Sequence, residues 1–365
     1  MKSTLHLLVI VYFITLGSFS CSNSEKEIRH KMNVTDQIVG ENLKVKNLDG
    51  RSFIAIKDSF FIMNSFYNDS LVIIYDLKDN NRLIKVGSYI IKGNGPNEFN
   101  SISGQMIDEM LEIIDSHGQI TKLSTVNIKS LVEKEDINNF VNQDLSWIKP
   151  FNYGGDFIRL NDSLLLLLGG DYEDRNLITM IDLNNKTKTP LNYWVEDSYN
   201  DVNIPKQMAY CSNSRVFKNK QKVLFASGLG RYLEILTLSD QRIVDRKLIY
   251  GFTPIIEKRN DNLNYKVKFE SYRGMKVRTT NKYIYVRLKT YQDENGNQLN
   301  ITDFKGYPYY YNDELEVYDW DGNFIRNYQT DIPFNDFIVT DNNQTLFIVS
   351  QDIDSGEPII VKYRL

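Results

Sequence analysis

The chain has 365 residues, which is enough for one large domain or two of ordinary size. It contains 23 tyrosines and 19 phenylalanines but only three alanines; aromatic residues favour strands and alanine favours helices, so an all-β fold is expected. The formal net charge of -4 and the pI of about 5.6 supply no general positive field, which argues against a nucleic-acid partner.

The N-terminal segment has the features of a signal peptide, which we assign to residues 1–20. A short basic start precedes an apolar run over Leu5–Phe19, which is too short to span a membrane comfortably. Small residues then precede Cys21 as in a lipobox, with Ser18 where leucine is usual. We therefore predict lipidation of Cys21 and a tether over residues 21–37. The alternative is an ordinary secretory peptide with an incidental Cys21.

A lipid on Cys21 implies attachment to a membrane of the cell envelope. We expect the outer membrane, on its periplasmic or its surface face, because residues 25–27 (Glu-Lys-Glu) resemble the acidic export signals of Bacteroides-type surface lipoproteins. Cys211 is the only other cysteine. The mature domain therefore needs no internal disulfide, and Cys211 is expected to be a small buried apolar residue.

One short pattern recurs along the chain, consisting of polar turn residues followed by an alternating apolar strand. Successive copies begin 50 to 62 residues apart, at Lys57, Ile107, Asn161, Lys218, Thr280 and Asp341. Propeller blades repeat about every 40–50 residues, and long loops extend that period. Most copies are followed by a second pair of strands that turns at Asp or Asn, which is typical of β-hairpins.

These repeats predict a six-bladed β-propeller of four-stranded antiparallel blades over residues 38–365. The chain ends on a strand at residues 359–365 that has no downstream partner, and an early strand near residues 43–45 has no blade of its own. We expect this N-terminal strand to complete the last blade, because ring closure removes exposed sheet edges. A seven-bladed ring or a pair of β-domains is the alternative.

The densest turn signal follows the first predicted blade, at Gly93-Asn94-Gly95-Pro96-Asn97-Glu98-Phe99. Its glycines and its proline favour a sharp turn between strands. Together with the six repeats and Cys21, this loop resembles the TolB-like six-bladed propeller lipoproteins of Bacteroides-type bacteria, over residues 39–365. The resemblance implies the fold and an envelope location, and it implies no catalytic residues.

Residues for nucleophilic or metal-dependent catalysis are scarce. Only His117 lies within the predicted propeller, so no catalytic triad, metal centre or cofactor is expected. Gly93 and Gly95 do not suit a phosphate loop, because Pro96 removes an N–H donor and no helix follows. Two acidic clusters, residues 171–174 and 293–297, lack EF-hand spacing and are expected to be solvated turns rather than calcium sites.

A binding face is the remaining interpretation. Loops between blades and loops inside the middle hairpins of a propeller reach the same rim, and tyrosines, which suit carbohydrate or peptide contacts, recur in them. The candidate ligand-binding residues are Tyr67, Asn94, Glu98, Asp171, Tyr172, Arg231, Arg273 and Tyr291. For the tyrosines, capping of the blades is an equal alternative. For Asn94 and Glu98, a structural role between adjacent blades is favoured.

We therefore expect a lipid-anchored envelope protein that binds a partner at its loop-rich face, either an envelope protein or an oligosaccharide or peptide. The alternative is an envelope carbohydrate-active enzyme, a glycan lyase or hydrolase. Glycoside hydrolysis needs two carboxylates that flank one bond. Such a pair could come from Glu98, Asp171, Glu173, Asp174 and Asp293.

Overall fold

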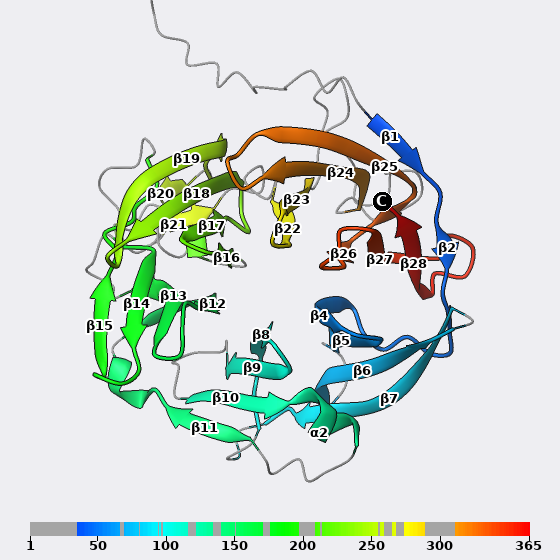
Figure 1. Cartoon of the computed structure of the whole chain (residues 1–365), viewed down its shortest axis with the longest axis horizontal. Coiled ribbons are helices and arrows are strands. Elements are labelled where there is room, and N and C mark those ends of the chain that lie inside the picture. Colours follow the sequence, from blue (N-terminus) through cyan, green and yellow to red (C-terminus); the bar gives the residue numbers. More distant parts are fainter. Residues whose placement is uncertain are drawn as a thin grey trace, which may run out of the picture. The chain divides into compact units, whose positions relative to one another are not determined.

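The computed structural model describes residues 35–65, 69–79, 81–93, 95, 98–115, 122–133, 140–149, 151–170, 176–196, 209–211, 214–254, 256–258, 265–267, 274–288 and 311–365. All of them belong to the second of the chain's two units, residues 34–365. Six β-sheets surround a common axis as the blades of a propeller (Figure 1), which confirms the predicted fold. No helix among these residues is long and apolar enough to cross a membrane.

Each blade has an inner strand nearest the axis and further strands outward from it. Blade 1 contains β4 (Ser52–Lys57), β5 (Phe60–Asn64), β6 (Ser70–Lys78) and β7 (Arg82–Ile91). Blade 2 contains β8 (Ile102–Ile107), β9 (Met110–Asp115), β10 (Lys122–Asn127) and β11 (Val141–Asp144). Blade 3 contains β12 (Asn152–Arg159), β13 (Leu164–Gly170), β14 (Ile178–Asp182) and β15 (Thr187–Pro190).

The second half of the ring repeats this order. Blade 4 contains β16 (Arg215–Asn219), β17 (Lys222–Ala226), β18 (Arg231–Ser239) and β19 (Arg242–Phe252). Blade 5 contains β22 (Met275–Thr279), β23 (Tyr283–Leu288), β24 (Asn312–Asp319) and β25 (Phe324–Phe334). Blade 6 contains β26 (Asp336–Val339), β27 (Thr345–Gln351) and β28 (Pro358–Arg364).

Short elements interrupt the blade pattern. The hairpin of β20 (Ile256–Lys258) and β21 (Tyr265–Val267) lies between blades 4 and 5 in the sequence. Helix α2 (Ile128–Val132) precedes β11, and the 3₁₀ helix η1 (Ser146–Ile148) follows it. The Asn127 side chain caps α2 by accepting the N–H groups of Lys129 and Ser130.

The six sequence repeats form the second strand of each blade. These strands are apolar because blades cover both of their faces; Leu165–Leu168 of β13, for example, are fully buried. Blades 3 and 4 share a core that includes Leu166 and Phe225. In three of the turns that precede these strands, Asp58, Asp108 and Lys220 have φ of 53°, the left-handed conformation that tight hairpin turns require.

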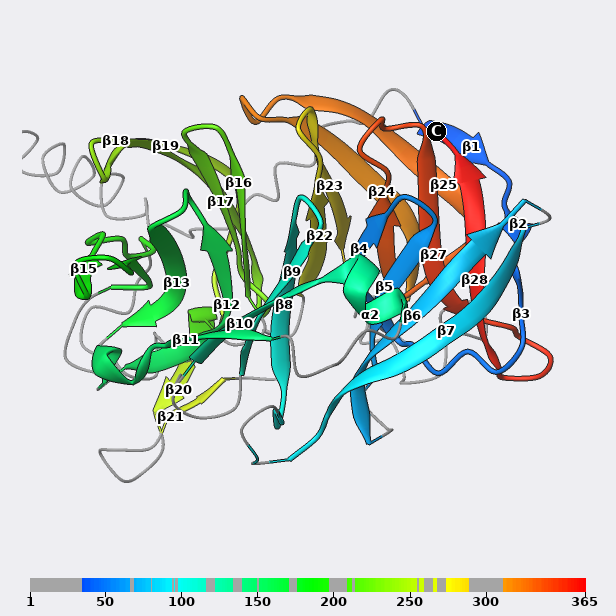
Figure 2. The ribbon, with the colours of Figure 1, turned by 60° about the horizontal axis from the view of Figure 1, so that its bottom comes forward.

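Residues 35–45 cross the outer edges of three blades, and we call this segment the strap. Strand β1 (Thr35–Ile38) pairs in parallel with β25 of blade 5. Strand β2 (Glu41–Asn42) pairs antiparallel with β28 of blade 6, and β3 (Lys44–Val45) pairs in parallel with β7 of blade 1. Figure 2 shows the strap in blue, outside these blades. It thus joins the end of the ring to its beginning.

The expected closure of the last blade by an N-terminal strand is confirmed, with one difference in detail. Blade 6 is completed by β2, whereas residues 43–45 divide between two blades. The Leu43 N–H donates to the Ile360 carbonyl at 2.8 Å, and the Lys44 N–H donates to the Asn81 carbonyl at 2.9 Å. A two-residue strand such as β2 is too short to show a sequence periodicity, which is why only its neighbour was predicted.

Gly40 lies where the strap passes from blade 5 to blade 6. Its N–H donates to Asp331 Oδ1 at 3.2 Å, and the Tyr363 hydroxyl donates to the same oxygen at 2.8 Å. A Cβ at position 40 would lie 2.3 Å from Val361 Cγ1 and 2.6 Å from the Tyr363 ring. Only glycine therefore allows the strap to lie this close to β28.

We predict that Gly40→Val lowers the stability of the propeller by about 1–3 kcal/mol, because the added side chain forces the strap away from β28. The measurement is the urea unfolding midpoint of the mature protein. Val39→Ala is the matched control, because Val39 is 81% exposed and should change stability by less than about 0.5 kcal/mol. An unchanged midpoint for Gly40→Val would show that the strap does not secure the ring.

Candidate functional site

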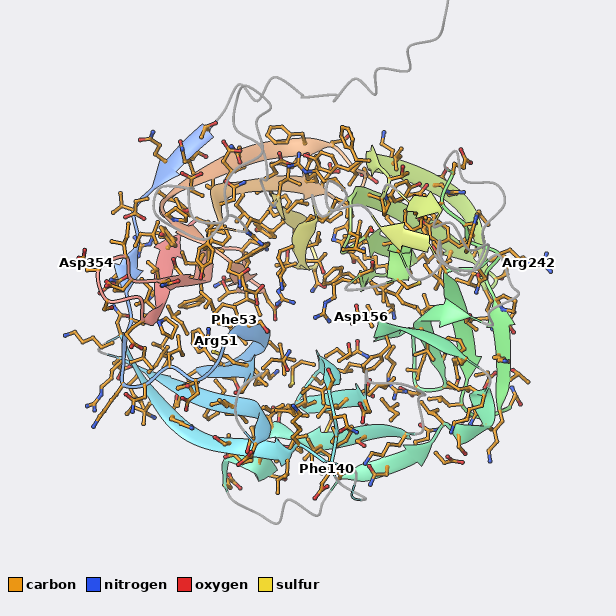
Figure 3. The ribbon with its side chains drawn as sticks, turned by 180° about the vertical axis from the view of Figure 1, so that it is seen from behind. Arg51, Phe53, Phe140, Asp156, Arg242 and Asp354 are labelled. Carbon is orange, nitrogen blue, oxygen red and sulfur yellow. The ribbon has the colours of Figure 1, made fainter. Side chains whose placement is uncertain are left out.

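Six polar residues occupy the same level of the six inner strands. Five of them pair with the fifth residue of the adjacent second strand, and Asp156 directly precedes Phe157, which pairs with the fourth. In blade order they are Ser52, Ser103, Asp156, Arg215, Lys276 and Asp336, and we call them the axial ring. Figure 3 shows Asp156 at the inner side of the blades, with Arg242 and Asp354 at the outer side.

Successive residues of a strand point to opposite faces, so the ring residues and the residues that follow them have different surroundings. The residues that follow the ring members in four blades are Phe53, Phe157, Val216 and Phe337, and all of them are buried in the packing between blades. The ring residues point the other way. The carboxylates of Asp156 and Asp336 accept backbone N–H groups from the inner strand of the next blade.

Asp156 joins three blades through one carboxylate. It accepts the hydroxyl of Ser103 in blade 2 at 2.8 Å, and in blade 4 it accepts the N–H of Val216 at 2.8 Å and Nη1 of Arg215 at 3.0 Å. The Asp156 side chain is buried, whereas that of Arg215 is 38% exposed. The carboxylate is therefore satisfied on several sides, and the Arg215 side chain is partly exposed.

Asp336 has the same role three blades away. It accepts the N–H of Phe53 in blade 1 at 2.8 Å and Nη2 of Arg278 in blade 5 at 3.2 Å, and Lys276 Nζ lies 4.0 Å away. Burial raises the pKa of Asp336, but the charges of Arg278 and Lys276 and the backbone N–H groups outweigh burial, so the pKa lies below its ordinary value of 3.8. Asp336 is therefore a buried, ionised group.

The pKa of Lys276, another ring member, is also shifted. Asp336 raises its pKa, but burial and the guanidinium groups of Arg278, Arg215 and Arg287 outweigh that effect and lower the pKa to about 8. The Lys276 side chain is nevertheless 34% exposed. A cationic group that is repelled by its neighbours and accessible to solvent is a candidate for contact with an anion.

Two buried glutamates occupy one level of the third strands in blades 4 and 5: Glu234 pairs with Phe225, and Glu316 pairs with Val286. Each accepts two tyrosine hydroxyls, those of Tyr193 (2.7 Å) and Tyr232 (3.1 Å) for Glu234, and those of Tyr250 and Tyr318 (2.9 Å) for Glu316. Tyr193 follows blade 3 and Tyr250 belongs to blade 4, so these hydrogen bonds also join successive blades.

The loop after blade 1 is held by its own side chains. The Glu98 carboxylate accepts the N–H of Gly95 at 2.7 Å, and a Cβ on Gly93 would lie 2.1 Å from Glu98 Oε2. Phe99 is buried in the core of blades 1 and 2, with Lys122 Nζ 4.2 Å from its ring centroid. The glycines thus make room for Glu98, and Phe99 anchors the turn.

Of the predicted ligand-binding residues, the structure describes two. Glu98 lies in the loop between blades 1 and 2, whereas Arg231 lies half-buried at the start of β18 in blade 4. Burial raises the pKa of Glu316, and the charge of Arg231 acts in the opposite direction. The other predicted functional residues lie outside the described residues; they are Cys21, Tyr67, Asn94, Asp171, Tyr172, Arg273 and Tyr291.

Other predictions concern the remaining acids, metal sites and cysteines. His117, Glu173, Asp174, Asp293 and both acidic clusters also lie outside the described residues. Within the described part of the chain, no group of three His, Cys, Asp or Glu side chains could hold a metal ion. Cys211 is buried as expected, and burial raises the pKa of its thiol to about 12, so this thiol is unreactive.

The axial ring was not predicted from the sequence, although a signal for it exists. Its members lie three to five residues before the start of each repeat, as Ser52 before Lys57 and Asp336 before Asp341 show. A polar residue at one level of an otherwise apolar inner strand indicates contact between blades or with a ligand. The second strands carry the stronger apolar pattern, and that pattern dominated the prediction.

One further polar feature lies at the level of the axial ring. Asn64, the last residue of β5, pairs with Ser52, and Ser65 follows it. Asn64 Oδ1 and Ser65 Oγ are buried and have no hydrogen-bond partner in the described part of the chain. Buried polar atoms are normally satisfied by protein, water or ligand. These two therefore mark a position in blade 1 where a bound molecule or a water could be accepted.

Comparison with known proteins agrees with this architecture. The family model for TolB-like six-bladed propellers matches residues 48–342, and the chain belongs to this family. The structure of a DUF4221 family member from Bacteroides vulgatus is similar, with 11% identity over 91% of this chain and 97% of that one and a TM-score of 0.55.

A second similar structure is that of a protein presumed to be exported, from Bacteroides fragilis. It has 13% identity over 91% of this chain and 99% of that chain, with a TM-score of 0.51. At such identities the likeness shows the fold alone. A search of curated proteins found no match. The TolB-like propeller fold suggests a binding or interaction role.

We predict that Asp336→Asn lowers stability by about 3 kcal/mol at neutral pH, because Arg278 and Lys276 lose their buried counter-charge. The folded-state pKa of Asp336 is lowered, so its contribution is present above pH 3.8 and is lost as the pH falls further. Urea unfolding at several pH values measures this difference. Asp321→Asn, at an exposed ion pair with Lys222, should cost less than about 1 kcal/mol; an equal cost would contradict the assignment.

Proposed function

We propose that this protein is a lipid-anchored binding protein of the cell envelope that captures a ligand or partner at the loop-bearing face of the propeller. The observation that carries the proposal is the axial ring. Its two acids are buried and satisfied by neighbouring blades, while Arg215 and Lys276 expose about a third of their side chains. The ring thus combines a rigid frame with accessible charged groups, which a binding site requires.

The strand ends that flank the predicted binding loops lie on the same face as the axial ring. Ser52, Arg215 and Asp336 are the first residues of their inner strands, and Ser103 and Lys276 are the second. Because neighbouring strands in a blade are antiparallel, the start of an inner strand lies at the same end as the loop between second and third strands. Tyr67, Asp171, Tyr172 and Tyr291 belong to such loops, which supports a shared binding surface.

The contacts of the ring acids and the lowered pKa of Asp336 favour binding over glycan cleavage. A glycosidase needs one carboxylic acid whose pKa is raised so that it can protonate the leaving group. Asp336 has a lowered pKa, and both Asp156 and Asp336 are occupied by donors from adjacent blades. Glu316 has a raised pKa, but its carboxylate is buried and hydrogen-bonded to two tyrosines.

The envelope location rests on the lipobox-like sequence before Cys21, and the presumed export of the Bacteroides fragilis relative agrees with it. We expect the wild-type protein, expressed in a Bacteroides host, to partition into the detergent phase of Triton X-114. Cys21→Ser should move it to the aqueous phase, because no lipid can then be attached. Cys211→Ser is the control and should leave partitioning unchanged. An aqueous wild-type protein would contradict lipidation.

A binding screen tests the proposed function directly. The mature protein should bind at least one member of a glycan array or an envelope-peptide library, without releasing reducing sugar from it. The triple variant Tyr67→Ala, Tyr172→Ala and Tyr291→Ala should lose that binding while it keeps the wild-type urea midpoint. Retained affinity in the triple variant would reject the loop surface, and glycan turnover would reject the binding-only function.

A further inference from the structure

We propose that the axial ring holds a carboxylate group of the ligand between Arg215 and Lys276, at the junction of blades 4 and 5. The inference rests on the proposed binding function and names its ligand class, which is a molecule with at least one free carboxylate. It follows from the order of charges around the ring, from the exposure of the charged side chains and from the backbone N–H groups that already bind Asp156 and Asp336.

The order of charges singles out one junction. Every pair of neighbouring ring residues except one contains a serine or an aspartate, so no two like charges are adjacent in those pairs. The exception is the pair of Arg215 and Lys276, because both residues are cations. These two cations stand at the same level of β16 and β22, which are in contact, and Asn219 Nδ2 further joins the blades by donating to the Asn281 carbonyl at 2.8 Å. Like charges at neighbouring positions repel each other unless an anion lies between them.

The exposure of the side chains also favours the junction of Arg215 and Lys276. Arg215 and Lys276 are 38% and 34% exposed, whereas Asp156 and Asp336 are 7% and 0% exposed. The acids are therefore buried, whereas both cations are partly exposed. Asp336 is also shared with Arg278, which lies closer to it than Lys276 does. Lys276 Nζ, which carries three donors, is thus only partly compensated.

The donors at this level suit a carboxylate better than a phosphate. Phosphate sites commonly use several backbone N–H groups, but the N–H groups of Val216 and Phe53 are bound to Asp156 and Asp336. A guanidinium and an ammonium together offer donors to the two oxygens of one carboxylate. Burial is the larger cause of the lowered pKa of Lys276, and the repulsion by Arg278, Arg215 and Arg287 adds to it; this repulsion agrees with a site that has an excess of positive charge.

Titration calorimetry of the mature protein with tricarballylate at low salt tests the site. Wild type should bind this tricarboxylate, and Lys276→Gln and Arg215→Gln should each weaken binding by about tenfold or more. Lys276→Arg, which keeps the charge, should retain binding within about threefold. Lys247→Gln, on the exposed outer strand β19, is the matched control and should bind as wild type does.

Proton uptake on binding can be measured with the wild-type protein, so this test does not depend on whether a variant folds. An anion beside Lys276 favours its charged form, so binding at pH 8 should take up protons, measured as a difference in apparent enthalpy between two buffers. At pH 6 Lys276 is already protonated, and the uptake should vanish. Lys276→Gln should abolish the uptake at pH 8. A wild-type protein that binds tricarballylate with no proton uptake at pH 8 would overturn the role of Lys276.

Further experiments identify the source of the carboxylate and distinguish failure of the carboxylate site from failure of the proposed binding function. A uronic-acid disaccharide and a peptide with a free C-terminus, each compared with its neutral amide, should bind only in the acidic form. Absence of tricarballylate binding, unchanged affinity in both Gln variants or tighter binding of inorganic phosphate would overturn the carboxylate site. If a neutral glycan still bound in the screen, the binding function would stand; glycan turnover would overturn that function instead.

Discussion

The rest of this propeller depends on the seam between the last and the first blade, because an open ring would expose to water the apolar faces that these two blades bury against each other. The seam is secured twice. At the outer edge, the strap pairs with β25, β28 and β7 in turn. At the inner edge, Asp336 accepts the N–H of Phe53 and the guanidinium of Arg278, and so joins the same three blades.

The inner edge repeats this arrangement on the opposite side, where Asp156 joins blades 2, 3 and 4. Both acids lie at one level of the inner strands, and each is bound to the backbone of the following blade. This use of buried carboxylates fixes the position of the cations beside them. Arg215 and Lys276, which are partly exposed, are therefore held beside these acids, and side chains that are held in place lose less entropy when they bind a ligand.

Much of the fold could be predicted from the sequence. The six copies of the turn-and-strand pattern identified the second strands, because a strand covered on both faces needs an apolar run, and the loop from Gly93 to Phe99 identified the family. The path of the strap and the axial ring could not be predicted. Strand β2 has two residues, and the ring consists of single residues that are joined across blades. Ser103 and Asp156, for example, are 53 positions apart in sequence.

The sequence by itself determined the class of this protein: an all-β chain with six repeated units and a TolB-like loop after the first unit. Local periodicity and turn chemistry carry that information, since they act over a few neighbouring residues. Only the tertiary structure decided which polar residues meet. Ser103, Asp156, Arg215, Lys276 and Asp336 come together because ring closure brings the inner strands of six distant segments around one axis.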